Sequence, residues 1–239
     1  MSNSKKNLID IRIERKELKY YITYGEYIIL SNLLRKVLRQ DKHNEAGNGY
    51  FVRSLYFDTV DNRSFEEKMA GLEERSKYRL RIYDTNTQLV KFEIKSKRNN
   101  SVIKETAIIG RKDADEIQNG NYELMLKYSD PVLHKAYAEF KKRHYRRVVL
   151  IDYFREAFIH DLNGVRIVFD RFLKSTPLQL DIFSNDSFST QKLRKGLVIM
   201  EIKYNRFVPK FLKHMLQIPS FERRALSKYC IGRLDYFEV

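Results

Sequence analysis

The sequence predicts an α+β protein with about eight strands that pair mainly antiparallel. About eight segments alternate polar and apolar side chains, and helical patterns separate some of them. Aromatic residues, which favour strands, number 16 Tyr and 15 Phe, whereas the chain has only nine Gly and four Pro. No change in composition divides the 239 residues. We therefore expect a single domain covering residues 1–239.

The first half of the chain is expected to contain five strands and two helices. Alternation predicts strands at 11–24, 50–58, 76–83, 89–97 and 102–109. Apolar residues at helical spacing, such as Ile29 and Leu33, predict a helix over 26–38. A short helix is expected to begin at Asp61, which can cap it, and to end before Gly71.

In the second half a helical region comes before the remaining strands. The pattern is helical between residues 113 and 143, and Pro131 is compatible with a helix start. Strands are expected at 148–158, 164–169 and 197–204. A helix that begins at Pro209 and ends at Met215, and a last helix near Ser227, complete the prediction.

The charge balance favours a polyanionic partner. Lys and Arg number 46 against 31 Asp and Glu, which gives a net charge of +15 and a pI near 9.7. Nucleic acid, an anionic membrane surface and a phosphate-rich molecule all satisfy this requirement. Composition alone does not choose among them.

Several classes of site are missing from the sequence. Cys230 is the only cysteine, and the five His residues lack the spacing of metal ligands. No Gly-rich phosphate loop and no His-Glu-x-x-His motif occurs. Metal binding would therefore depend on carboxylates, which favour Mg²⁺ or Mn²⁺. The first residues are polar and no run of 18 apolar residues follows, so a cytoplasmic protein is expected.

Basic and acidic residues share faces of several predicted strands. Lys77, Arg79 and Arg81 lie on one face of the strand at 76–83, and Glu201 and Lys203 share a face of a later strand. One such face alone is usually solvated surface. Because the pattern recurs, a closed eight-stranded sheet could turn these faces inward around an anion.

Several segments, taken in order, resemble the VTC domain, the polyphosphate polymerase branch of the triphosphate tunnel metalloenzymes. The resemblance covers nearly the whole chain. The similar segments are Arg15–Tyr20, Ser54–Thr59, Arg75–Tyr83, Phe92–Lys95, Lys104–Glu105, Tyr153–Phe158, Val165–Asp170, Met200–Tyr204 and Ser227–Cys230.

The resemblance implies an antiparallel eight-stranded β-tunnel with peripheral helices and a C-terminal helix near the tunnel mouth. In such a tunnel the γ-phosphate of ATP is transferred to a growing polyphosphate chain. The catalytic residues that it implies are Arg79, Arg81, Lys95, Arg155, Arg166 and Lys228. The implied substrate-binding residues are Lys19, Lys104, Tyr153, Ser227 and Lys203. Glu201 matches the carboxylate that binds Mn²⁺ or Mg²⁺, with Glu93 and Glu17 as second candidates.

Two alternatives share the same tunnel. One is a hydrolase acting on triphosphate or polyphosphate, and the other is a polyphosphate-binding module without catalysis. Nucleic acid is not expected, because Tyr56, Phe57, Tyr83, Phe92 and Phe169 lie in runs that predict core packing. No transmembrane segment is predicted, and a membrane partner is left open.

Overall fold

The fold is described here from a computed structural model. It describes residues 16–44, 49–98, 101–176, 181–185, 189–216, 221–223 and 225–234. The helices are α1 (Tyr24–Arg35), α2 (Arg63–Met69), α3 (Arg111–Gln118), α4 (Pro131–Arg143), α5 (Lys210–Met215) and α6 (Lys228–Arg233). The 3₁₀ helices are η1 (Tyr122–Lys127) and η2 (Leu162–Gly164).

Eight long strands and three strands of two residues make up one antiparallel sheet. The long strands are β1 (Lys16–Thr23), β3 (Tyr50–Asp58), β4 (Arg75–Ile82), β5 (Leu89–Arg98), β6 (Ser101–Gly110), β7 (Arg146–His160), β8 (Val165–Thr176) and β10 (Leu197–Tyr204). The short strands are β2 (Arg39–Gln40), β9 (Thr190–Gln191) and β11 (Glu222–Arg223). The expected antiparallel α+β architecture is confirmed.

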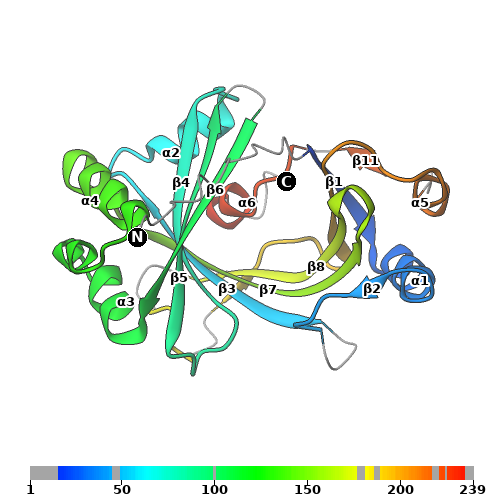
Figure 1. Ribbon diagram of the computed structural model, residues 1–239, viewed down its shortest axis with the longest axis horizontal. Helices are drawn as coiled ribbons and strands as arrows, with labels where there is room; N and C mark the ends of the chain where they lie inside the picture. Colours follow the sequence, from blue (N-terminus) through cyan, green and yellow to red (C-terminus); the bar gives the residue numbers. More distant parts are fainter. Residues whose placement is uncertain are drawn as a thin grey trace, which may run out of the picture.

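The order of the strands shows that the sheet is open rather than closed. It runs β11-β1-β10-β8-β7-β3-β4-β5-β6, with β2 beside β7 and β9 beside β8. Within the described residues no backbone ladder joins β6 to β1 or β11, so the expectation of a closed sheet is wrong. The sheet instead curves, with β4, β5 and β6 forming one side and β1 and β10 the other (Figure 1).

The element boundaries follow from local chemistry. Thr23 ends β1 because it caps α1: its hydroxyl accepts from the Glu26 backbone, and Glu26 accepts from the Thr23 backbone N–H at 2.7 Å. The expected strand at 11–24 therefore stops one residue early, and its first five residues lie outside the described part. Pro131 occupies the first turn of α4, where Asp130 caps the helix.

Several helices cover the outer faces of the curved sheet. Apolar side chains of α3, η1 and α4 pack on β4, β5 and β6 around Phe92 and Phe140. Helices α1 and α5 pack on β8 and β10 around Phe169 and Met200. Because alternate residues of a strand face opposite ways, the charged residues of these strands face the concave side. The concave side is where the candidate site lies.

None of the helices in the described residues combines the length and the hydrophobicity needed to cross a bilayer.

Candidate functional site

A cavity of about 1,050 Å³ lies inside the curve of the sheet. Its lining holds twelve Lys or Arg side chains and two Glu side chains. The basic residues are Lys16, Lys19, Lys68, Arg75, Lys77, Arg79, Arg81, Lys95, Lys97, Arg155, Lys203 and Lys228. Such an excess of positive charge in a concave space attracts a polyanion.

Strands β1 and β10 form one wall of the cavity, on which opposite charges face each other. Glu17 lies opposite Lys203 in the antiparallel register, and Lys19 lies opposite Glu201. Lys203 Nζ is 3.0 Å from Glu201 and 3.4 Å from Glu17. Burial alone would raise the pKa of Glu17, but Lys19, Lys203 and Lys95 lower it to about 2. We call Glu17, Lys19, Glu201 and Lys203 the paired wall.

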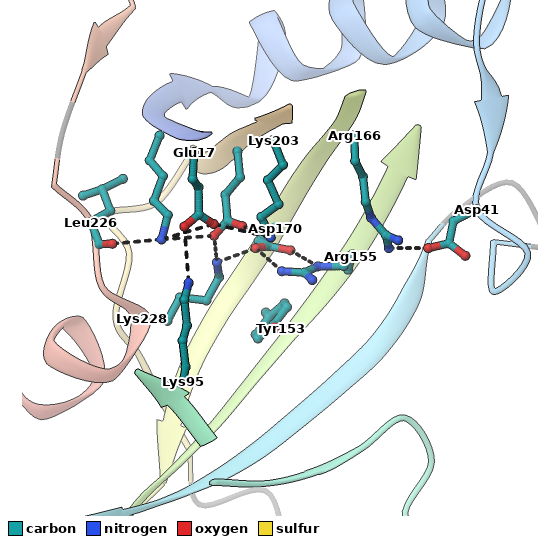
Figure 2. Close-up of polar contacts among 12 residues, drawn as sticks. Glu17, Asp41, Lys95, Tyr153, Arg155, Arg166, Asp170, Lys203, Leu226 and Lys228 are labelled. Carbon is teal, nitrogen blue, oxygen red and sulfur yellow. Dashed lines mark hydrogen bonds and ion pairs between the residues drawn. The ribbon is translucent and has the colours of Figure 1, made fainter. Parts of the chain in front are cut away.

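A buried carboxylate next to this wall holds two further cations. Asp170, on β8, accepts two hydrogen bonds from the Arg155 guanidinium at 2.7 and 2.8 Å. Lys228 Nζ lies 2.5 Å from both Asp170 and Glu201. Burial would raise the pKa of Asp170, but Arg155 and Lys228 hold it below its usual value. Arg155 and Lys228 are thereby oriented toward the cavity (Figure 2).

Strands β4 and β5 form the facing wall, on which like charges lie opposite each other. Arg75 lies opposite Lys97, and Lys77 lies opposite Lys95. Like charges at directly opposed positions destabilise a sheet. Lys95 reaches Glu17 across the cavity at 3.3 Å. The other three have no carboxylate partner within the described residues. We call Arg75, Lys77, Lys95 and Lys97 the like-charge wall.

Further along β4 and β5 the arginines are paired. Arg79 donates to Glu93 at 2.7 Å and to the Tyr56 hydroxyl at 2.9 Å. Arg81 lies 3.7 Å from Glu93, and Lys104 contacts the other oxygen of the same carboxylate. Burial would raise the pKa of Glu93, but these cations hold it far below its usual value. The fully buried Glu93 therefore fixes two arginines of the cavity lining.

Helix α6 closes one side of the cavity and is anchored from outside it. The Tyr229 hydroxyl donates to the buried Asp58, and Arg233 donates to the Tyr229 oxygen at 3.0 Å. Gly232 lies so close to β7 that an added Cβ would be 2.7 Å from the Ile151 side chain. The anchoring places Ser227 at the cavity, where it accepts from Lys77 at 2.7 Å.

Most of the residues that the sequence singled out come together in the cavity. They are Glu17, Lys19, Arg79, Arg81, Lys95, Tyr153, Arg155, Glu201, Lys203, Ser227 and Lys228. Three others are not part of its lining. Glu93 and Lys104 lie behind Arg79, whereas Arg166 contacts Asp41 away from the main cluster (Figure 2). Tyr153 accepts from Arg81 at 3.1 Å.

Several residues of the site had no predicted role. Asp170 ends a largely apolar stretch, although alternation from Arg166 through Val168 would have placed it on the inner face. Tyr56 was expected only in the core. It is indeed buried, but its hydroxyl faces the cavity beside Arg79. Lys77 was placed on the same face as Arg79 by alternation, but no catalytic or binding role was given to it.

The carboxylates of the paired wall are the candidate metal ligands. No three acidic, His or Cys side chains gather into a preformed metal site in the part of the chain that the structure describes. Glu17 and Glu201 nevertheless share contacts with Lys19 and Lys203 and both line the cavity. Mg²⁺ is often held by one or two carboxylates together with phosphate oxygens. The pair therefore fits a divalent ion that arrives with a phosphate ligand.

The family of this chain follows from a match to a known family model. The family model described as "VTC domain" matches residues 14–237. The chain belongs to the VTC domain family. Among curated proteins, none matches it.

Solved structures with low sequence identity resemble this VTC domain. A proposed adenylate cyclase from Bacillus halodurans has a TM-score of 0.50 and 11% identity, covering 85% of this chain and 88% of that one. A proposed adenylate cyclase from Vibrio parahaemolyticus has a TM-score of 0.47 and 13% identity, covering 92% and 98%. At 11% identity the Bacillus likeness shows the fold alone.

Proposed function

We propose that this VTC domain is a metal-dependent polyphosphate polymerase that transfers the γ-phosphate of ATP to the end of a polyphosphate chain. The observation that carries the proposal is the like-charge wall, which faces a paired wall in a family related to phosphate chemistry. A wall of opposed cations needs a polyanion to neutralise it. The lining of the cavity includes the like-charge wall as well as Arg79 and Arg81, so more than three phosphates would find cations.

The reaction requires positioning and charge neutralisation rather than a protein nucleophile. The anhydride bond between the β- and γ-phosphates breaks, a terminal oxygen of the polyphosphate forms a new P–O bond, and ADP leaves. Negative charge spreads over the transferred group, and guanidinium groups stabilise it best when they are already oriented. Glu93 orients Arg79, and Asp170 orients Arg155.

A divalent ion bound through Glu201, with Glu17 as a second ligand, would supply further neutralisation of the phosphate oxygens. Lys19 and Lys203 would then turn from these carboxylates toward the phosphates. Arg166 and Lys104 would act from the edges of the lining, and Ser227 and Tyr153 would donate hydrogen bonds.

The test is incubation of the purified protein with ATP and Mn²⁺, with polymer followed on a gel and ADP and orthophosphate measured in parallel. Polymer with equimolar ADP is expected, together with its loss in Glu201→Gln and in Arg79→Ala. His134→Ala, on the exposed face of α4, is the matched control. Orthophosphate without polymer would replace the polymerase by a hydrolase. Binding of tripolyphosphate without any product would leave a binding module.

A further inference from the structure

Three aromatic rings lie together next to the catalytic arginines, at a place to which no role has yet been given. The His43 ring lies nearly parallel to the Tyr83 ring, with centroids 5.5 Å apart and planes 8° apart. Tyr50 meets Tyr83 edge-on at 5.9 Å. We call these three residues the aromatic cluster. A parallel stack that ends in an exposed ring can receive another flat ring.

The aromatic cluster differs from the packed core in its exposure. His43 is exposed, and the two tyrosines are only partly buried. A stacked partner covers one face of a ring, so the exposed His43 ring offers its other face. Tyr83 packs against a core cluster, as expected from the sequence, and its ring also lies beside the exposed His43 imidazole.

The cluster lies just beyond the end of β4, close to cations of the site. Tyr83 directly follows Ile82, the last residue of β4, and Arg81 is the cation that acts most strongly on its phenol. Tyr50 lies opposite Arg155 in the register of β3 and β7, and Arg166 donates to its hydroxyl at 3.2 Å. Lys91 Nζ lies 4.7 Å from the centre of the Tyr83 ring. A ligand whose ring stacks on the cluster could therefore reach Arg81 and Arg155 with its phosphates.

The electrostatics agree with this placement. Burial would raise the pKa of Tyr83, but Arg81 and Lys91 lower it. Burial raises the pKa of Tyr50 to about 12, although Arg155 and Arg166 act in the opposite direction. Both phenols thus lie in the field of the cations that line or border the cavity. Phosphates attached to a ring on the cluster would meet these cations.

The two ends of β4 are chemically different. At its start, Arg75 and Lys77 belong to the like-charge wall, and Tyr83 directly follows its last residue, Ile82. About six residues separate Lys77 from Tyr83, which corresponds to roughly 20 Å of extended strand. Arg166 and Asp41 likewise lie on the far side of the site from Leu226 and Lys95 (Figure 2). One end therefore suits phosphates only, and the other suits a flat ring joined to phosphates.

We infer that the aromatic cluster binds the base of the nucleoside triphosphate donor by stacking, so that its triphosphate runs inward past Arg155 and Arg81 while polyphosphate occupies the like-charge wall. The inference rests on the proposed function, because it assigns the donor of that reaction to one end of the cavity. Stacking tolerates any base, since every base has an aromatic face. GTP should therefore bind about as tightly as ATP.

Calorimetry with ATP, GTP and tripolyphosphate on the full chain tests the inference. Base stacking contributes about 1–3 kcal/mol, so His43→Ala combined with Tyr83→Leu should raise the Kd of ATP about tenfold. The Kd of tripolyphosphate should stay within about twofold, which also shows that the fold is intact. The single variant His43→Trp keeps an aromatic ring at this position and should bind ATP at least as tightly as the unchanged protein. His134→Ala is the control.

Equal losses for ATP and tripolyphosphate, or no change in ATP binding, would overturn the nucleoside site, as would a wild-type protein that does not bind ATP. The gel assay for polymer separates this failure from failure of the proposed function. Polymer made by the double variant at an unchanged KM for ATP would keep the polymerase and reject the site. ATP binding that depends on His43, without formation of any polymer, would keep the nucleoside site and reject the polymerase.

Discussion

The two walls of the cavity both carry basic side chains but balance their charge in opposite ways. On the paired wall Lys19 and Lys203 each lie opposite a glutamate. On the like-charge wall cations lie opposite cations. The difference teaches that positive charge serves two purposes here. The paired wall maintains its own geometry without a ligand, whereas Arg75, Lys77 and Lys97 of the like-charge wall are neutralised only when a polyanion binds.

The comparison predicts the largest effect at Asp170, which balances cations beside the paired wall. Asp170→Asn leaves Arg155 without its buried carboxylate partner and Lys228 with Glu201 alone, and it should lower the free energy of unfolding by about 3–5 kcal/mol. Urea denaturation measures this. The control is Asp161→Asn, whose carboxylate is 85% exposed and pairs with Arg39. It should cost less than about 1 kcal/mol. Equal costs for the two variants would contradict the comparison.

On the like-charge wall the expected loss is one of affinity rather than stability. Lys77→Ala combined with Lys97→Ala removes two charge-assisted contacts and should weaken binding of long-chain polyphosphate about a hundredfold. The free energy of unfolding should not fall, because opposed cations are removed. Lys112→Ala with Lys142→Ala makes the same change of net charge on exposed residues of α3 and α4. Titration calorimetry and urea denaturation distinguish the two pairs.

The pH dependence of binding sharpens the role of Lys77. Burial lowers the pKa of Lys77 to about 8, and the neighbouring Lys19 and Lys68 also favour loss of its proton. Lys77 is therefore charged below this pH and neutral above it, so polyphosphate affinity should fall, by up to about tenfold, as pH rises from 7 to 9. Lys77→Arg stays charged throughout and should flatten the profile. An unchanged profile in Lys77→Arg would mean that another group controls it.

The smallest expected effect is a gain in stability from reversing one charge. Lys97→Glu places an acid opposite Arg75 and should raise the free energy of unfolding by roughly 0.2–1 kcal/mol. Lys203→Glu, on the paired wall, should instead lower it, since it would face Glu17. Thermal or urea unfolding of both variants provides the check. The same sign for both would show that the walls do not differ as described.

Much of the fold could be predicted from the sequence, because long strands show a period of two. The strands at 50–58 and 197–204 have the expected bounds, and all eight long strands were found. Strands β2, β9 and β11 were missed, since two residues show no periodicity. Closure could not be judged, because the curvature of a sheet depends on packing between strands far apart in the chain.

The site was partly predictable for the same reason. Alternation placed Arg79 and Arg81 on one face, and the resemblance to the VTC domain selected them. Neither source showed which acid would hold which base. Asp170 and Arg155 are cross-strand neighbours only through the pairing of β7 with β8, which includes a shift of register. The aromatic cluster likewise depends on His43, whose position follows from a loop rather than from a periodic element.

Lys95 and Glu17 meet where the open sheet would otherwise have to close. The Lys95 side chain is 41% exposed and that of Glu17 21%, so this contact contributes at most about 1 kcal/mol. In the described residues the seam between β5 and β1 is thus joined by side chains and not by a backbone ladder. The two sides of the sheet can therefore separate along this seam without breaking any hydrogen bond between paired strands.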